Sequence, residues 1–264
     1  MENLITFPNI NPVIFSIGPL DIRWYSIAYI LGLILGMEYM KYLNNKYKFE
    51  LNNLLINNFF LWAALGIVLG GRLGYIIFYN PSYYLNETTE IIKVWKGGMS
   101  FHGGLIGMII SLIMFSHKNK IKLFVLSDLV ACAAPIGIFL GRIANFINGE
   151  LVGRTTQSKL GMIFPHIDNE PRHPSQIYEA LLEGFMLFII LFLLTNIKSI
   201  KKKQGCLSAF FLIFYSIFRF VCEFFREPDS HIGLSILNLS FGQIYSIPFF
   251  FVGFFIFLKK FKQV

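Results

Sequence analysis

The sequence predicts an all-α polytopic membrane protein with about seven transmembrane helices. Of the 264 residues, 55% are hydrophobic and only 14% are charged, whereas a soluble domain carries about 25% charged residues. The apolar residues also gather in runs long enough to cross a bilayer as helices, which takes about 20 residues each. The composition therefore excludes an ordinary soluble domain.

Seven apolar runs are long enough to form spanning helices. They lie at about 22–42, 54–79, 98–116, 123–147, 174–196, 206–226 and 240–258. No repeat or linker divides them, so we expect residues 1–264 to form a single integral-membrane domain. The first 22 residues lack a basic segment and are interrupted by three prolines. We therefore expect this stretch to lie along the membrane surface rather than to cross it.

Basic residues predict the orientation, because cytoplasmic connections of membrane proteins are enriched in lysine and arginine. Thirteen of the 23 basic residues follow the first, third, fifth and seventh runs. Six lie in the connections on the other side, and the remaining four fall within or at the ends of helices. This bias places the N-terminus outside, in the periplasm, and the C-terminus in the cytoplasm. The formal net charge of +8 follows from this topology, so it does not indicate nucleic-acid binding.

Several charged and polar side chains lie in or beside the apolar runs, where charge is expensive and usually marks a site. With the predicted orientation, Arg72, Arg142 and Arg219 lie toward the outer ends of the second, fourth and sixth helices. Tyr25 and His102 lie near the outer starts of the first and third. The cytoplasmic halves hold almost nothing comparable. We therefore expect a polar chamber open to the outer leaflet.

Two of the arginines suit an anionic phospholipid. Arginine stays charged when buried and forms bidentate hydrogen bonds with phosphate, so Arg142 and Arg219 are candidate phosphate contacts. Arg72 is a candidate third contact. Internal ion pairs, with Glu150 for Arg142 and with Glu223 for Arg219, are the alternative role. For Arg72 the alternative is a side chain that reaches from the helix end to the interface.

Other residue types suit proton transfer or head-group orientation. Histidine exchanges protons near neutral pH, so His102 is a candidate base, with a structural hydrogen bond as its alternative. Tyr25 and Tyr215 are candidates to orient a head group, although tyrosines are also common belt residues at a membrane interface. Asn145 and Asn148 repeat at i, i+3 and share a face if the fourth helix reaches that far.

The sequence does not favour a metal site, a disulfide framework or a serine hydrolase. The three cysteines have no CxxC partner and are expected to be buried packing residues. His166 and His173 lack the spacing of metal ligands. The segment His173–Glu179 is interpreted as a helix start, with Pro174 in the first helical position and Glu179 in the first turn.

In chain order, seven segments resemble the bacterial prolipoprotein diacylglyceryl transferases. They are Arg23–Tyr25, Gly71–Tyr75, Gly98–Gly104, Gly141–Gly153, His173–Glu179, Arg219–Asp229 and Ser240–Gln243. The resemblance covers nearly the whole chain. It implies an enzyme of the cytoplasmic (inner) membrane with seven helices, its N-terminus outside and its active site facing the outer leaflet.

The resemblance also implies the reaction. The diacylglyceryl group of phosphatidylglycerol moves to the thiol of the lipobox cysteine of a secreted prolipoprotein, the first step of lipoprotein maturation, and glycerol phosphate leaves. No metal or organic cofactor is implied. On matching positions, it implies catalytic roles for His102, Arg142 and Arg219. The residues that match the family's phospholipid-binding and signature positions are Arg142, Arg219, Tyr25, Tyr215, Asn145 and Gly153, and we expect Asn148, Glu150 and Glu223 to support them.

The expected mechanism is attack by the precursor thiol on the glycerol carbon that bears the phosphate. His102 takes the thiol proton, directly or through water, and Arg142 and Arg219 stabilise charge on the departing phosphate. Two other functions are weighed against this one. A lipid or anion transporter requires inverted repeats and a second polar cluster toward the cytoplasm. A membrane scaffold has no need for several charged groups at one depth.

Overall fold

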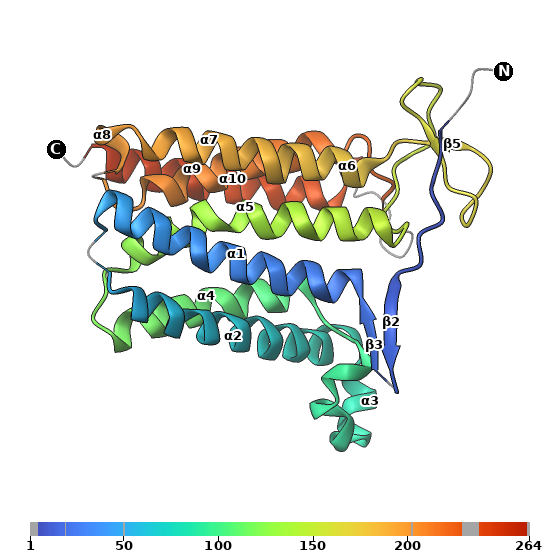
Figure 1. Cartoon of the computed structure of the whole chain (residues 1–264), viewed down its shortest axis with the longest axis horizontal. Coiled ribbons are helices and arrows are strands. Elements are labelled where there is room, and N and C mark those ends of the chain that lie inside the picture. The colour runs from blue at the N-terminus through green and yellow to red at the C-terminus, as the bar shows by residue number, and fades with distance from the viewer. Residues whose placement is uncertain (1–4, 19, 50, 202, 229–237, 263–264) are drawn as a thin grey trace. The chain divides into compact units, whose positions relative to one another are not determined.

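The computed structural model describes residues 5–18, 20–49, 51–201, 203–228 and 238–262, and they are mostly helical (Figure 1). The chain forms two compact units. The larger unit comprises residues 1–39 and 128–264, and the smaller unit comprises residues 40–127. The two units are described separately below, and the single integral-membrane domain stays a prediction.

The larger unit is a helical bundle. It contains most of α1 (Trp24–Tyr47) and α5 (Leu123–Ile147), together with α9 (Cys206–Cys222) and α10 (Phe241–Phe261). Between α5 and α9, one continuous helical stretch consists of α6 (Ser175–Glu179), η3 (Ala180–Met186) and α7 (Leu187–Thr195), and the short α8 (Lys198–Lys201) follows it. The elements α6, η3, α7 and α10 all pack against α9. This arrangement brings segments that lie far apart in the sequence next to α9 (Figure 1).

The strands lie in the N-terminal segment and in the long polar connection. β2 (Val13–Ile17) and β3 (Leu20–Arg23) form an antiparallel hairpin that leads directly into α1. β1 (Ile5–Thr6) pairs in parallel with β4 (Met162–Ile163), which pairs antiparallel with β5 (Pro171–Arg172). Phe7, Val152 and Phe164 form a small buried core beside this sheet. The N-terminal segment is therefore tied to the connection 148–173, and its position along the membrane surface stays a prediction.

The smaller unit is built on α2 (Asn53–Tyr79) and α4 (Phe101–Lys118), which pack along each other. Three short elements connect them: α3 (Pro81–Asn86), η1 (Thr88–Ile92) and η2 (Val94–Lys96). Both long helices begin at a capping side chain. Asn52 accepts a hydrogen bond from the N–H of Leu54, and Ser100 accepts one from the N–H of Gly103.

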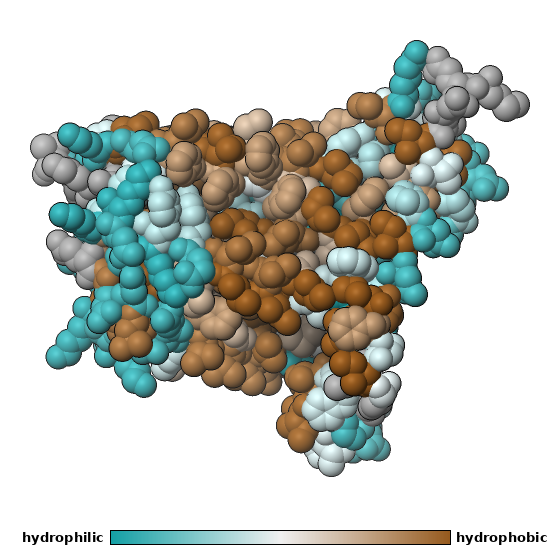
Figure 2. Space-filling model, viewed as in Figure 1, coloured by the Kyte–Doolittle hydropathy of each residue, from teal (hydrophilic) through white to brown (hydrophobic). Residues whose placement is uncertain are grey.

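Among the described residues, five helices are long and apolar enough to span a membrane. They are Asn53–Tyr79, Phe101–Lys118, Leu123–Ile147, Ser175–Thr195 and Phe241–Lys260. Figure 2 shows hydrophobic residues along the middles of the helices and hydrophilic residues toward their ends. The chain is a polytopic membrane protein on this basis. The count of seven spanning helices and the orientation of the termini stay predictions.

Helices occur in all seven predicted ranges, but some ends differ. The prediction 123–147 coincides with α5, whereas α1 runs on to Tyr47 and α9 ends at Cys222 rather than at 226. The segment after α9 turns away because its backbone finds partners in the long connection. Arg154 donates its N–H to the carbonyl of Phe225 at 2.9 Å, and Glu227 donates its N–H to the carbonyl of Val152 at 3.3 Å.

Candidate active site

Arg142 lies near the end of α5 and faces two buried carboxylates. Its Nη1 lies 3.2 Å from Oε2 of Glu179, and its Nη2 lies 3.2 Å from Oε2 of Glu183. Both glutamate side chains are completely buried, while that of Arg142 is 18% exposed. A buried carboxylate requires a partner of this kind, because an isolated buried charge is strongly unfavourable.

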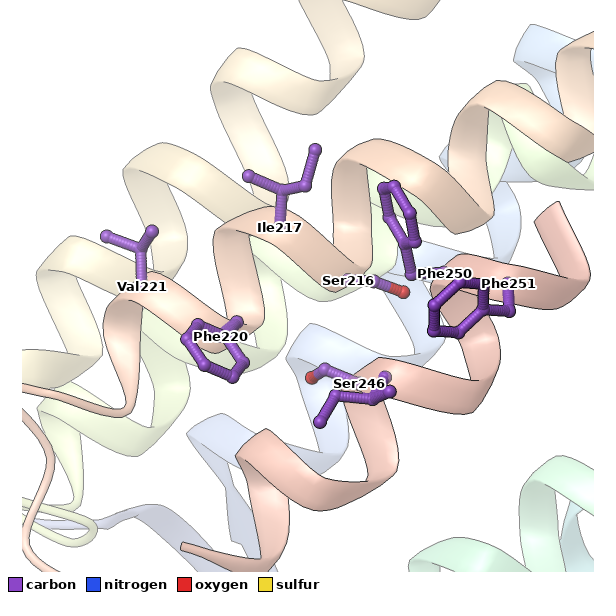
Figure 3. Close-up of a pocket in the computed structure, with 8 residues that line it drawn as sticks. Ser216, Ile217, Phe220, Val221, Ser246, Phe250 and Phe251 are labelled. Atoms are coloured by element: carbon purple, nitrogen blue, oxygen red, sulfur yellow. The ribbon is translucent and has the colours of Figure 1, made fainter. Parts of the chain in front are cut away.

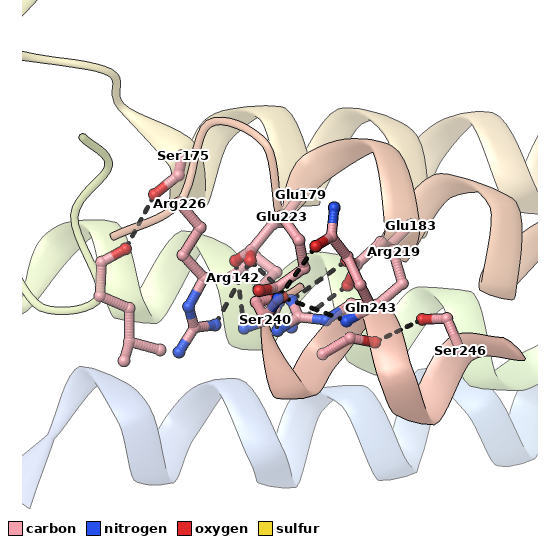
Figure 4. A network of polar contacts seen from close by, with 12 residues as sticks. Arg142, Ser175, Glu179, Glu183, Arg219, Glu223, Arg226, Ser240, Gln243 and Ser246 are labelled. Atoms are coloured by element: carbon pink, nitrogen blue, oxygen red, sulfur yellow. Dashed lines mark hydrogen bonds and ion pairs between the residues drawn. The ribbon is translucent and has the colours of Figure 1, made fainter. Parts of the chain in front are cut away.

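Arg219 of α9 approaches the same two carboxylates. Its Nη1 donates to Oε1 of Glu179 at 2.7 Å and to Oε1 of Glu183 at 3.3 Å, and its Nη2 donates to Glu223 on its own helix. Arg226, just after α9, lies 3.4 Å from Oε1 of Glu179. Figure 4 shows these side chains converging from α5, α6, η3, α9 and the segment after α9. We call the set the arginine–carboxylate cluster: Arg142, Glu179, Glu183, Arg219, Glu223 and Arg226.

Local backbone structure places the two carboxylates. Glu179 ends α6 and Glu183 lies four residues later, so both point to one side of the helical stretch. The segment Ala180–Met186, which follows Glu179 and contains Glu183, is a π-helix, which is uncommon and frequently occurs at functional sites. Gly184 allows α5 to approach this segment closely. A Cβ atom at Gly184 would lie 2.6 Å from Cβ of Phe139, one turn before Arg142.

The structure contains one of the two ion pairs weighed above and adds others. Arg219 pairs with Glu223, whereas Arg142 pairs with Glu179 and Glu183 among the described residues rather than with Glu150. The helix start predicted at this segment is present, because α6 begins at Ser175, but Glu179 lies at the end of α6 and not in its first turn. Its carboxylate is buried against three arginines. In the sequence, the sign of these two missed partners, Glu179 and Glu183, is a pair of acidic residues four positions apart in an apolar run.

The two candidate tyrosines also belong to the larger unit. Tyr215 is half-buried one turn before Arg219 on α9, and it interacts electrostatically with Arg142 and Arg219. The hydroxyl of Tyr25 lies 3.2 Å from that of Tyr29, and Tyr25 interacts electrostatically with Arg142 and Glu150. The structure thus brings both tyrosines into the electrostatic environment of the cluster.

The end of α5 is tied to the start of α6. Asn145 and Asn148 both donate to Oε1 of Glu150, at 2.7 and 3.3 Å. Gln176 donates its side-chain N–H to the carbonyl of Glu150 at 2.6 Å. Asn145 is buried and Glu150 is exposed. These hydrogen bonds order the turn that follows Arg142, so the three predicted residues form one group.

Gly153 lies where the long connection meets two other segments. Its N–H donates to the carbonyl of His173 at 2.9 Å, its carbonyl accepts from Nη1 of Arg172 at 3.1 Å, and it forms a β-bridge with Arg226. Arg172 also donates to Asp168 at 2.6 Å. These hydrogen bonds lower the pKa of the Asp168 carboxyl and raise the pKa of Arg172, while partial burial lowers the pKa of His173. The contacts described for Gly153 are therefore backbone hydrogen bonds that join chain segments, which is a structural role.

Arg72 and His102 belong to the smaller unit. Arg72 is buried and donates to the carbonyls of Glu90 and Gly97 at 2.6 Å and of Ile91 at 2.9 Å. Its guanidinium also lies over the ring of Tyr84. Arg72 therefore organises the segment between α2 and α4, and a phosphate contact by it stays a prediction. His102 lies exposed in the first turn of α4.

One buried carboxylate lies at the opposite end of α5 from Arg142. Asp128 accepts hydrogen bonds from the N–H of Gly205 at 2.7 Å and from the N–H and hydroxyl of Ser208 at 2.8 and 2.6 Å. The expectation that this end would hold almost nothing comparable is wrong. Asp128 caps the start of α9 from another helix, which is a structural role.

An apolar groove of about 280 Å³ lies between α9 and α10 (Figure 3). Phe220, Phe250 and Phe251 line it, together with Ser216 and Ser246. Phe220 directly follows the arginine of the cluster on α9. The groove therefore begins on the same helix that carries Arg219.

The described residues include no group of three or more His, Cys, Asp or Glu side chains that could hold a metal ion. Cys132, Cys206 and Cys222 are free thiols. The charged groups that the cluster brings together are guanidinium and carboxylate groups. Among the described residues, the Nε–H of Arg142 and that of Arg219 have no protein acceptor, so both arginines keep a donor for an anion.

Comparisons with known proteins agree on one family. The family model described as prolipoprotein diacylglyceryl transferase matches residues 12–259. A phosphatidylglycerol–prolipoprotein diacylglyceryl transferase of Rickettsia felis is 51% identical over 94% of this chain and 96% of its own length. Relatives with the same name from Rickettsia africae and Rickettsia bellii are 50% and 48% identical, over 94% and 97% of this chain and 96% and 97% of their own. The matched range contains the whole smaller unit and nearly all of the larger one.

Proposed function

Because the chain belongs to the prolipoprotein diacylglyceryl transferase family, it is a transferase of lipoprotein maturation, and we propose that the arginine–carboxylate cluster is its phospholipid site. The names of its relatives specify phosphatidylglycerol and a prolipoprotein. The proposed reaction moves the diacylglyceryl group of phosphatidylglycerol to the thiol of the lipobox cysteine of a secreted prolipoprotein. Glycerol phosphate is the second product.

One observation carries this assignment. Arg142 of α5 and Arg219 of α9 share the same two buried carboxylates, so two guanidinium groups are held side by side. Each also keeps an Nε–H donor among the described residues. Paired guanidinium groups are suited to the oxygens of a phosphate, and fixed donors of this kind stabilise charge that develops in a transition state.

The proposed mechanism assigns each group one task. The precursor thiol loses its proton and attacks the glycerol carbon, the bond from that carbon to oxygen breaks, and the electron pair leaves with the phosphate. Arg142 and Arg219 stabilise the departing phosphate. His102 is the proposed proton acceptor, directly or through water. No cysteine of the enzyme takes part, in keeping with the burial of all three thiols.

The remaining predicted residues have supporting tasks in this proposal. Tyr25 and Tyr215 orient the head group, which their electrostatic interactions with Arg142 support. Asn145 and Gly153 shape the wall of the site through their hydrogen bonds to the long connection. Arg72 is the proposed third phosphate contact. The groove between α9 and α10 is the proposed place of an acyl chain, because its lining is apolar.

The membrane arrangement is part of the same proposal. The chain crosses the bacterial cytoplasmic (inner) membrane seven times as one domain, with its N-terminus in the periplasm and its site facing the outer leaflet. The bias of basic residues supports this orientation. A secreted precursor and the lipid would then meet at the outer surface.

The test is a gel-shift assay in which a lipobox peptide is incubated with phosphatidylglycerol and membranes that contain each variant. Arg142→Ala and Arg219→Ala should abolish transfer with the protein still inserted. Arg23→Ala is the matched control, because the Arg23 side chain is 56% exposed and pairs only loosely with Asp21, at 3.5 Å. Near-normal transfer by Arg142→Ala would refute the assignment. A loss of only a few-fold in His102→Gln would reduce His102 to a structural role.

A further inference from the structure

The guanidinium group of Arg72 joins two parts of the connection between α2 and α4. Its Nε donates to the carbonyl of Ile91 at 2.9 Å and its Nη2 to that of Glu90 at 2.6 Å, both in η1. Its Nη1 donates to the carbonyls of Gly97 and Gly98 at 2.6 and 3.2 Å, just before α4. All three nitrogens of one side chain therefore hold the end of the connection against its middle.

The contact between Arg72 and the two glycines is buried and depends on their backbone conformation. Arg72 is only 5% exposed, and its Cζ lies 5.0 Å from the centre of the Tyr84 ring. Gly97 and Gly98 have φ angles of +84° and +75°, in the left-handed region that glycine adopts without strain. A Cβ atom at Gly98 would lie 2.9 Å from Nη1 of Arg72. The local sequence is therefore matched to a guanidinium group at this place.

The same two glycines lead into the first turn of α4, which carries His102. Ser100 donates its N–H to the carbonyl of Gly71, the neighbour of Arg72 on α2, at 2.8 Å. The Ser100 hydroxyl caps α4 by accepting from the N–H of Gly103 at 3.2 Å. His102 lies between these two residues, so the position of its backbone follows from the end of the connection that Arg72 holds.

The middle of α4 is held on α2 by a separate contact. A Cβ atom at Gly107 would collide with the carbonyl oxygen of Gly66, and one at Gly70 would lie 2.8 Å from Cα of Gly107. Gly107 lies more than one turn beyond His102 along α4. A change at Arg72 should therefore displace the first turn of α4 and leave the packing of the two helices in place.

We propose that Arg72 is a positioning residue for the proton-transfer step, because it fixes where His102 presents its imidazole. The inference rests on the proposed function, in which His102 accepts the proton of the precursor thiol. Proton transfer needs donor and acceptor within hydrogen-bond reach, and a displacement of about 1 Å can lower a rate about a hundredfold. The phosphate contact proposed above for Arg72 is a separate task with a different kinetic effect.

The experiment is a double-mutant cycle on transfer by the full-length protein in detergent micelles, with a lipobox peptide and phosphatidylglycerol as substrates. Arg72→Lys keeps the positive charge, but its single nitrogen cannot hold both parts of the connection. The kcat of Arg72→Lys should fall about 10- to 100-fold. In His102→Gln, which should itself lose about 100-fold or more, the added Arg72→Lys change should lower kcat little further. A loss of folded protein would instead lower transfer equally in both backgrounds.

Gly98→Ala tests the same contact from the other side, and it serves if Arg72→Lys does not fold. The added methyl group is strained at a φ of +75° and approaches Nη1 of Arg72, so kcat should fall in the wild-type background but not in His102→Gln. Lys93→Gln is the matched control. The Lys93 side chain is 32% exposed and pairs with Glu90 at 2.6 Å in the same connection, so its loss should change kcat little.

An unchanged kcat in both Arg72→Lys and Gly98→Ala would overturn the inference. So would a loss of the same size with and without the His102→Gln change. A raised KM for phosphatidylglycerol with kcat unchanged would also overturn it, because that is the mark of a phosphate contact alone. A loss of only a few-fold in His102→Gln would instead refute the proposed role of His102, and the inference would fall with it. The two failures are therefore distinguishable.

Discussion

Replacement of Asp128 by alanine should destabilise the larger unit. The carboxylate of Asp128 accepts three hydrogen bonds, from the N–H of Gly205 at 2.7 Å and from the N–H and hydroxyl of Ser208 at 2.8 and 2.6 Å. Gly205 begins α9 without a side-chain cap of its own. Asp128 is only 2% exposed, so water cannot take its place. Asp128→Ala therefore removes the carboxylate that accepts from the buried N–H of Gly205 and from the partly buried N–H of Ser208.

The loss of folding free energy in the Asp128 variants follows from these contacts. A buried donor left unpaired costs about 1–3 kcal/mol, so two of them make Asp128→Ala cost about 2–6 kcal/mol. Asp128→Asn keeps one acceptor oxygen but loses the charge that strengthens all three hydrogen bonds, so it should cost about 1–2 kcal/mol. For a chain of this size, each kcal/mol lowers Tm by about 2–4 °C. The alanine variant should therefore melt at least about 4 °C below the wild type.

The assay is thermal unfolding of the purified protein in detergent micelles at a fixed concentration. Asp21→Ala is the control, because Asp21 is 45% exposed and its ion pair with Arg23 is a surface pair worth at most about 1 kcal/mol. A wild-type Tm in Asp128→Ala would refute the reasoning. An asparagine variant as unstable as the alanine variant would show that the charge, and not the pairing of donors, dominates.

Three further changes test the packing and the charges around the site. Gly184→Val should destabilise the protein by about 1–3 kcal/mol and reduce transfer, because the valine side chain would collide with Phe139. Thermal unfolding measures the loss of stability, and the gel-shift assay measures the loss of transfer. Gly242→Ala should slow transfer about tenfold, or about 1.4 kcal/mol, because its Cβ would displace the Glu223 carboxylate that holds an arginine. Asp168→Asn should lower Tm at neutral pH, and this difference should shrink as the pH falls below about 3.9, because the stability that the lowered pKa of Asp168 adds is lost as pH falls through the folded-state pKa.

The helices were predictable from sequence because hydrophobic length alone determines them. The run 123–147 coincides with α5 because, apart from Ser127 and Asp128, the residues before Arg142 are apolar or small. Ends were less predictable where a distant segment decides them. α9 ends at Cys222 because Phe225 and Glu227 hydrogen-bond to the connection around Gly153, more than 70 residues earlier in the chain.

The arginines of the site could be predicted from the sequence, but their carboxylate partners could not. Arg142 and Arg219 stood out because a charge in an apolar run is costly wherever it lies. Their partners did not stand out, since Glu179 follows a proline and a serine at a helix start and resembles a first-turn acid. Asp128 was missed in the same way, because it lies six residues into a predicted helix and its partners lie 77 and 80 residues away. Which residues pair with one another depends on the tertiary structure, and the spacing of residues in the sequence alone does not reveal it.

The two shared carboxylates also explain why arginine suits this site. Two bare guanidinium groups inside a membrane protein would repel each other, and each would lose its hydration. Glu179 and Glu183 remove that cost by placing a carboxylate between Arg142 and Arg219. The same neutralisation weakens the long-range attraction of an anion. Recognition of a phosphate must then depend on how the N–H donors that the carboxylates do not use are oriented. Arginine offers five N–H donors in a fixed plane, whereas lysine offers a mobile point charge.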